Sequence, residues 1–305
     1  MRFLLLLSFC LSSVTFAQSY AERFDTAWRL VNERYWNLES LGVDWDAQRE
    51  TYEPLALEAE SDAAFYELIA DMYTELGDNH SVFVPPERVL EIRNEYGDLP
   101  CLGVFGLGVF AQNDRTQLGN LSYELRGEVG YIELPDLASE RVGANLREAV
   151  LGLESAGASS LVLDLRGNPG GRLVEMMQAA GVFTSGFLWR TVTNWTLPIP
   201  YPALGTPATE LPLVVLIDAE VNSAAEGLAG ALQQKERATI IGETSAGNVE
   251  AVLPFCLRDG SQAWIATGVL APIGAATWEG RGVVPDIETP AGDALDEALS
   301  LLAGD

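Results

Sequence analysis

The sequence predicts an α/β fold preceded by a helical segment, and three observations support this. Short apolar strands alternate with amphipathic helices between residues 130 and 241, which is the order found in α/β domains. The stretch from Leu213 to Ile217 is a continuous apolar run, typical of a strand that is buried on both faces. Tyr20 to Leu76 has helical periodicity instead. A chain of 305 residues with 48% apolar content is expected to form one sizeable globular unit, or a core with a small subdomain.

The chain begins with a segment that has the features of a cleaved secretory signal. Met1 to Ala17 has Arg2 near its start, an apolar stretch from Phe3 to Phe16 and a small residue at its end. This segment is too short and too abruptly ended for a membrane span, and no later stretch approaches the length of a spanning helix. We therefore expect a secreted or periplasmic protein whose mature chain is not inserted in a membrane.

Residues 18–81 are expected to form a helical cap. Apolar side chains recur at helical spacing on two faces, which comprise Phe24, Ala27, Trp28, Leu30, Val31 and Tyr35, and then Phe65, Leu68, Ile69, Met72 and Leu76. Gly77-Asp78 ends the last helix, and Asn79-His80-Ser81 follows as a turn. Residues 82–127 are mixed, with a break at Pro85-Pro86, a short helix over Glu87–Glu95 and glycine-spaced apolar runs as far as Phe110.

The α/β core is expected over residues 128–305. Its strands are predicted at Gly130–Leu134, Ser160–Leu165, Leu213–Ile217 and Ala238–Ile241, and its helices at Ala138–Ala156, Leu173–Gly181, Ala224–Gln234 and Ala294–Leu302. The tail from Val252 to Pro285 returns to strands. The glycine-rich loop at 167–171 resembles a phosphate cradle only superficially, because no Lys-Ser/Thr follows it. Such a loop is better suited to bringing backbone N–H groups close to a bound carbonyl.

Ser223 lies where a buried strand ends and a helix begins. In that position a hydroxyl can stand clear of the sheet, and a backbone N–H can point at a developing oxyanion. The simpler interpretation is that Ser223 is an N-cap, which is the commonest role of a serine before a helix. The sequence around Ser223 alone leaves both roles open.

The charge and composition of the chain bear on which molecules it can bind and on its cysteines. The net charge of −26 repels phosphate backbones, so we expect no nucleic-acid partner. We also expect no cofactor and no metal. After the signal, the chain holds only Cys101 and Cys256; in an oxidising compartment they can form a disulfide, or each can be an ordinary buried apolar residue.

The segment around Ser223 resembles the nucleophile region of the C-terminal processing peptidase and tricorn family of S41-type serine peptidases. The matching motifs are Ser223-Ala224-Ala225-Glu226, Gly242-Glu243-Thr244, Leu-Val-Leu-Asp-Leu-Arg-Gly-Asn-Pro-Gly-Gly at 161–171 and Gly-Val-Val-Pro-Asp at 282–286. The resemblance implies a crotonase-like spiral core of ββα units and a peptide or protein substrate. Processing peptidases commonly carry a PDZ domain after the cap. Here the interval 82–127 is too short for a full module of about 80 residues with linkers, so we expect a hairpin or linker in its place.

The resemblance also implies which residues carry the chemistry, with Ser223 as nucleophile. Processing peptidases use a lysine base, but Asn248 occupies that position, and the chain's only lysine, Lys235, lies roughly 18 Å along the helix from Ser223. The chain therefore resembles the tricorn-type Ser–His–Glu variant more closely, with its only histidine, His80, as base.

In the tricorn-type pattern a serine precedes the base, and Asn79 stands there as an altered auxiliary residue. The glutamate that would orient the base corresponds to Glu279, with Glu250 as the second choice. The implied oxyanion donors are the Ala224 N–H and the N–H of Gly170 or Gly171.

We expect a secreted serine peptidase that works through an acyl-enzyme. Two alternatives stay open. Retinoid-binding proteins of the eye resemble the same fold, so the chain is also compatible with a catalytically inactive module that binds a hydrophobic ligand or peptide. The same nucleophile is also compatible with a hydrolase of small esters, although the sequence lacks a Gly-x-Ser-x-Gly elbow.

Overall fold

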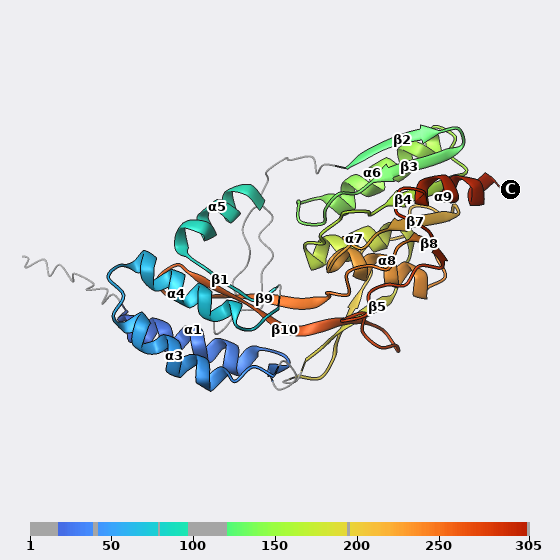
Figure 1. Ribbon diagram of the computed structural model, residues 1–305. Coiled ribbons are helices and arrows are strands. Elements are labelled where there is room, and N and C mark those ends of the chain that lie inside the picture. Colours follow the sequence, from blue (N-terminus) through green and yellow to red (C-terminus); the bar gives the residue numbers. More distant parts are fainter. Residues whose placement is uncertain (1–17, 39–41, 79, 97–120, 194–195, 304–305) are drawn as a thin grey trace, which may run out of the picture.

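The structure is a computed structural model that describes residues 18–38, 42–78, 80–96, 121–193 and 196–303. Three helices of the cap lie at one end of the molecule and an α/β layer structure lies at the other, with two long strands running between them (Figure 1). The predicted signal segment, 1–17, lies outside the described residues. Asn79 and residues 97–120 also lie outside the described residues. The auxiliary role of Asn79 and the absence of a PDZ domain from the interval 82–127 therefore stay predictions.

A six-stranded sheet forms the centre of the α/β part, in the order β11-β8-β7-β4-β3-β2. Its strands are β2 (Ser122–Arg126), β3 (Val129–Glu133), β4 (Ser160–Asp164), β7 (Leu213–Ile217), β8 (Thr239–Gly242) and β11 (Ile287–Glu288). All neighbouring pairs are parallel except β2–β3. The predicted mixed α/β fold is therefore confirmed. Every residue of β4 and β7 is buried, as the continuous apolar sequence of β7 predicts.

Helices cover both faces of this sheet. On one face lie α6 (Val142–Ser155), α7 (Leu173–Phe183) and α8 (Ala224–Gln234), which share a large apolar cluster with the strands. On the other face Ala294 and Ala298 of α9 (Ala294–Ala303) pack against Val162 and Val214. In a parallel sheet that is covered in this way, the loops that follow the strands lie together at the carboxyl ends of the strands. Ligand-binding and active sites are commonly built there.

A second sheet joins the cap to the core. It contains β1 (Val82–Val84), β5 (Phe187–Val192), β6 (Ile199–Pro202), β9 (Glu250–Cys256) and β10 (Gln262–Pro272). Strand β10 pairs with β1, β5 and β9, all antiparallel. The strands β5 and β6 are an addition that the sequence analysis did not predict.

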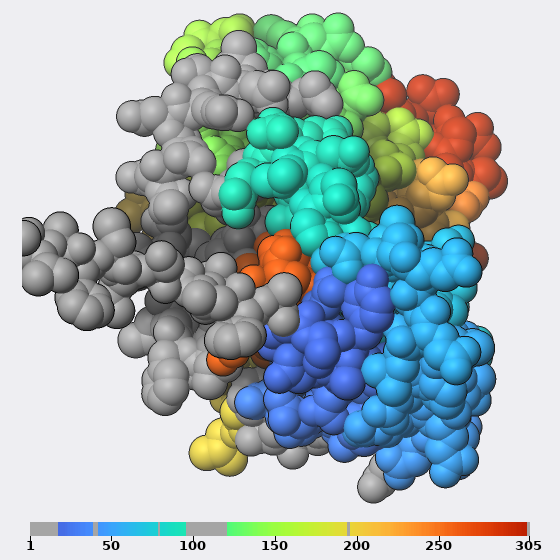
Figure 2. All heavy atoms as spheres, turned by 90° about the vertical axis from the view of Figure 1, so that its left-hand side faces the viewer, coloured from blue at the N-terminus to red at the C-terminus, as the bar shows by residue number. Residues whose placement is uncertain are grey.

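The cap consists of α1 (Tyr20–Arg34), α3 (Trp45–Leu57) and α4 (Asp62–Thr74). Ser19, Asp44 and Ser61 cap the three helices by accepting hydrogen bonds from backbone N–H groups. The apolar faces of the cap pack on Phe83 and on Ala263, Ile265 and Ala266 of β10. Helix α5 (Pro86–Tyr96) follows β1, close to the predicted 87–95. Figure 2 shows α5 above the cap, with orange atoms of the β9–β10 region reaching the surface between them.

Two details depart from the sequence expectations. The helix predicted from Ala138 begins only at Val142, because Asp136 binds the Ala138 and Ser139 N–H groups and Arg141 has a positive φ of 68°. Strand β9 begins at Glu250 rather than at Val252. Cys256 is disulfide-bonded, whereas Cys101 lies outside the described residues. Among the helices that the structure describes, none has the length and hydrophobicity needed to span a membrane.

Candidate active site

Ser223 occupies the turn between β7 and α8, with φ of 54° and ψ of −119°. A positive φ is uncommon for a residue other than glycine and persists only where the surroundings enforce it. Here the Ser223 N–H donates to Asn248 O at 3.1 Å and to Glu226 Oε2 at 2.9 Å. The backbone of Ser223 is therefore held on the segment that follows β8.

Glu226 is the main support of this turn, and it is fully buried. Its Oε2 accepts from the N–H groups of Ser223 and Asn248, each at 2.9 Å, and its Oε1 accepts from Ser245 Oγ and the Gly247 N–H, each at 2.6 Å. A buried carboxylate normally requires such compensation. The sequence analysis named Glu226 only as the last residue of the Ser223–Glu226 motif. The spacing Ser-x-x-Glu, a capping-box pattern, was the signal for the larger role.

The glycine loop at 167–171 lies directly against Ser223. A Cβ on Gly170, whose φ is 91°, would meet Asn222 O, Ala224 N and Ser223 Cβ at 2.7–2.9 Å, so no larger residue fits there. Asn168 organises the loop from a fully buried position, because its side chain binds Leu134 O and accepts the Gly170 N–H.

That hydrogen bond distinguishes the two glycines, Gly170 and Gly171, that were expected as alternative oxyanion donors. The Gly170 N–H is taken by Asn168 Oδ1 at 2.8 Å, which argues against it as a donor. The N–H groups of Gly171 and Ala224 make no hydrogen bond to another described residue. Gly171 is fixed against Leu137, with which it forms a β-bridge.

His80 reaches the site from the turn between α4 and β1. Its N–H donates to Asp78 Oδ1 at 2.9 Å, and its Nδ1 lies 3.3 Å from Glu250 Oε2. The His80 side chain is 16% exposed and that of Glu250 is 5% exposed, so this contact is largely shielded from water. Binding of Nδ1 leaves Nε2 as the atom able to take a proton from a nucleophile.

The glutamate that contacts His80 is Glu250, the alternative to Glu279 for orienting the base. Glu279 Oε2 instead accepts the Val249 N–H at 2.7 Å. The cause is strand pairing, because β1 and β9 lie on either side of β10. The His80 turn immediately precedes β1 and Glu250 opens β9, so both reach the same end of the sheet. That pairing is not visible in the local sequence.

Asn248, which the sequence analysis matched to the lysine of processing peptidases, lies beside Ser223. Its carbonyl accepts the Ser223 N–H. Lys235 is the C-cap of α8, at the far end of the helix from Ser223. Among the described residues no hydrogen bond joins Ser223 to His80; the connection runs through the adjacent residues Asn248, Val249 and Glu250.

Burial raises the pKa of Glu279 above its ordinary value of 4.5. The negative charges of Glu250 and Glu226 add to the shift, while the Val249 N–H and His80 oppose it. A carboxyl group whose pKa is raised by folding contributes stability at low pH, and this contribution is lost as the pH rises through the raised pKa.

We therefore expect Glu279→Gln to become more stable relative to the wild type as the pH rises from 4.5. The Gln side chain can still accept the Val249 N–H but carries no charge. The measurement is Tm for both proteins from about pH 4 to about pH 7. Glu243→Gln is the matched control, since Glu243 also accepts one backbone N–H, from Ala291 at 3.1 Å. A Tm difference between Glu279→Gln and wild type that is independent of pH would contradict the assignment.

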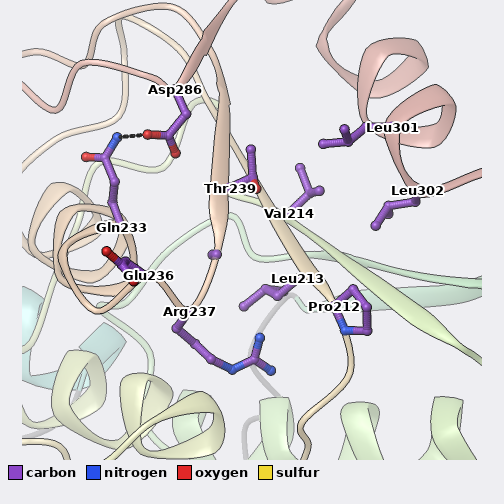
Figure 3. Close-up of a pocket in the computed structure, with 11 residues that line it drawn as sticks. Pro212, Leu213, Val214, Gln233, Glu236, Arg237, Thr239, Asp286, Leu301 and Leu302 are labelled. Carbon is purple, nitrogen blue, oxygen red and sulfur yellow. Dashed lines mark hydrogen bonds between the residues drawn. The ribbon is translucent and has the colours of Figure 1, made fainter. Parts of the chain in front are cut away.

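A hollow of about 510 Å³ lies away from these residues, at the end of the six-stranded sheet where β7 and β8 begin. Its walls include Leu213 at the start of β7, Thr239 at the start of β8 and Leu302 of α9, with the Gln233–Asp286 hydrogen bond at one side (Figure 3). Ser223 follows the other end of β7. The hollow is therefore not part of the candidate active site.

Two family models match the chain. The model of peptidase family S41 matches residues 128–289 and that of the tricorn protease C1 domain matches residues 16–74. A carboxyl-terminal-processing protease of Synechocystis sp. is 32% identical over 189 residues, which cover 58% of this chain and 44% of that protein. One of Picosynechococcus sp. is 38% identical over 140 residues, which cover 45% and 34%. The chain thus spans less than half the length of these relatives.

Solved structures resemble the whole fold. The photosystem II D1 C-terminal processing protease has a TM-score of 0.68 at 20% identity, covering 90% of this chain and 94% of that one. A lipoprotein from Streptococcus agalactiae has a TM-score of 0.73 at 16% identity, covering 95% and 98%. The tricorn protease has a TM-score of 0.51 at 15% identity, covering 94% of this chain and 37% of that one. At these identities the likeness concerns the fold.

Proposed function

Because the chain belongs to peptidase family S41, we propose that it hydrolyses peptide bonds through an acyl-enzyme formed on Ser223. The observation that carries the proposal is that the turn of Ser223 and the turn of His80 are each held by a buried glutamate. Ser223 has a positive φ enforced by Glu226 and Asn248, and the only histidine of the chain is held by a buried glutamate. A nucleophile, a base and an orienting carboxylate are the groups that serine catalysis requires.

In the proposed reaction Ser223 Oγ attacks the carbonyl carbon of the scissile bond while its proton passes to His80 Nε2. Glu250 stabilises the imidazolium through Nδ1. The N–H groups of Ala224 and Gly171 bind the oxyanion of the tetrahedral intermediate. His80 then gives its proton to the leaving amine and the C–N bond breaks. Water, deprotonated by His80, attacks the acyl-enzyme; the ester C–O bond breaks and His80 returns the proton to Ser223 Oγ.

The substrate class we propose is a peptide or protein, cut near its C-terminus as the names of the relatives suggest. The residues at 1–17 support a secreted or periplasmic enzyme. Residues 18–81 would act as the cap and 128–305 as the peptidase core. Asn248 in place of the lysine, together with Lys235 at the far end of α8, supports the Ser–His–Glu variant over the Ser–Lys variant.

Labelling with a fluorophosphonate tests the nucleophile. We expect the wild type to be labelled at Ser223 and Ser223→Ala to be neither labelled nor active on a fluorogenic peptide. Ser155→Ala is the control, because Ser155 lies exposed on α6, where its Oγ donates to Leu151 O. Labelling that persists in Ser223→Ala would place the nucleophile elsewhere. A folded wild type that is neither labelled nor active would favour the binding module, and labelling with turnover of small esters alone would favour the esterase.

A further inference from the structure

We propose that Tyr35 and Trp36, where the first cap helix ends, are positioning residues that hold Glu250 toward His80. This inference rests on the proposed function, since it assigns a role within the same site. Trp36 Nε1 donates to Glu250 Oε1 at 2.8 Å, and Tyr35 Oη donates to the same oxygen at 3.3 Å. The other oxygen, Oε2, is the one that contacts His80 Nδ1. The two oxygens of one carboxylate are thus divided between the cap and the base.

Two donors on one oxygen restrict the carboxylate in a way that a single donor cannot. With only the His80 contact, a glutamate can turn about its terminal torsion, which has broad minima. Donors from two directions oppose that rotation. A correctly aimed carboxylate is what an imidazolium intermediate needs at Nδ1.

Tyr35 is suited to act as a donor at this position. Burial raises its pKa, and the negative charges of Asp78 and Glu250 raise it further. The phenol therefore keeps its proton across the working range of a hydrolase, and its hydroxyl lies within hydrogen-bond range of both Asp78 and Glu250. The groups that face His80 and this cluster are Asp78 on its own turn, Tyr35 from the cap, Glu250 from β9 and Glu279 from the loop before β11.

The backbone supports the same connection. Trp36 N–H donates to Ala266 O, and Ala266 N–H donates to Ser81 Oγ, each at 3.0 Å. The end of α1 and the turn that carries His80 are therefore fixed to one residue of β10. The pairing of β10 with β9 shifts register between Ala266 and Gly268, just before Val269 pairs with Glu250. Cap, base and carboxylate thus meet within a few residues of β10.

The test compares Trp36→Phe and Tyr35→Phe with Trp28→Phe. Trp28 lies on the same helix and donates through Nε1 to Trp45 O at 2.9 Å, so its variant also loses a buried indole hydrogen bond in the cap. The chain has a single histidine, so NMR of an untagged protein follows the His80 ring directly. We expect the chemical shifts of the His80 ring to change in Trp36→Phe, and less so in Tyr35→Phe, because Glu250 is no longer held against Nδ1. Trp28→Phe should leave these chemical shifts unchanged while lowering Tm.

On a fluorogenic peptide, we expect Trp36→Phe to lower kcat about tenfold or more with KM little changed. Tyr35→Phe keeps the ring in place and tests the same claim if Trp36→Phe fails to fold. If the His80 ring chemical shifts and kcat of both variants match those of Trp28→Phe, the positioning role is overturned. If the chemical shifts change as expected but Ser223→Ala is as active as the wild type, the proposed function is overturned and the Glu250 arrangement stands.

Discussion

His80→Ala should lower kcat/KM by about 10³-fold or more, whereas Lys235→Arg should leave it within a factor of about two. Removing the imidazole leaves Ser223 without a base, so only binding and oxyanion stabilisation remain. Lys235 lies at the far end of α8 from Ser223, and its replacement by arginine keeps the charge at the helix terminus. The measurement is kcat/KM on a fluorogenic peptide, with Tm to confirm that both variants are folded.

The pH profile supplies a second readout for the same comparison. A histidine base must be neutral, so activity should rise with pH through the range in which histidine side chains lose their proton, about 6.5 in small peptides. A lysine base would require a strongly lowered pKa to be neutral near pH 7. An inactive Lys235→Arg together with an active His80→Ala would show the whole assignment of the base to be wrong.

Glu226→Gln should both destabilise the protein and abolish activity. Four donors converge on this buried carboxylate, and the amide of Gln would direct its own N–H groups at two of them. We expect a loss of about 3 kcal/mol, which corresponds to a fall in Tm of roughly 6–12 °C. Activity should disappear even below that Tm, because the backbone of Ser223 and the segment 245–248 lose their common support.

Glu175→Gln separates the two effects. Glu175 is also buried, and it accepts the N–H groups of Arg141 and Gly143 at 2.9 and 3.0 Å, but it touches neither Ser223 nor residues 245–248. Its replacement should lower Tm comparably and leave most of the kcat/KM. A Glu226→Gln variant that retains wild-type kcat/KM below its Tm would contradict the support role.

The core elements could be predicted because their signals are local. Leu213–Ile217 and Ala224–Gln234 were predicted with the bounds that the structure shows, since a continuous apolar run and a helical apolar face depend only on neighbouring residues. Ser223 followed from the boundary between them. Strands β5 and β6 were missed because they are stabilised by pairing with β10 and with each other, which depends on residues far along the chain.

The same limit explains the assignment of the glutamates and glycines. Glu250 and Glu279 are both flanked by plausible turn sequences, and only the pairing of β9 with β10 brings Glu250 to His80. Gly170 and Gly171 are adjacent and chemically identical. What separates them is the side chain of Asn168, a contact whose geometry depends on the folded loop.

Strand β10 has a consequence for how such an enzyme is made. The proposed nucleophile and base are separated by 143 residues (223 − 80), and the strands next to the base and its glutamate, β1 and β9, meet only across β10. On a ribosome the cap and the serine segment both emerge before β10 (Gln262–Pro272) is complete. A nascent or truncated chain that lacks β10 would therefore hold the serine without its proposed base in place. Under the proposed function, the order of synthesis would keep the chain inactive until β10 has been made.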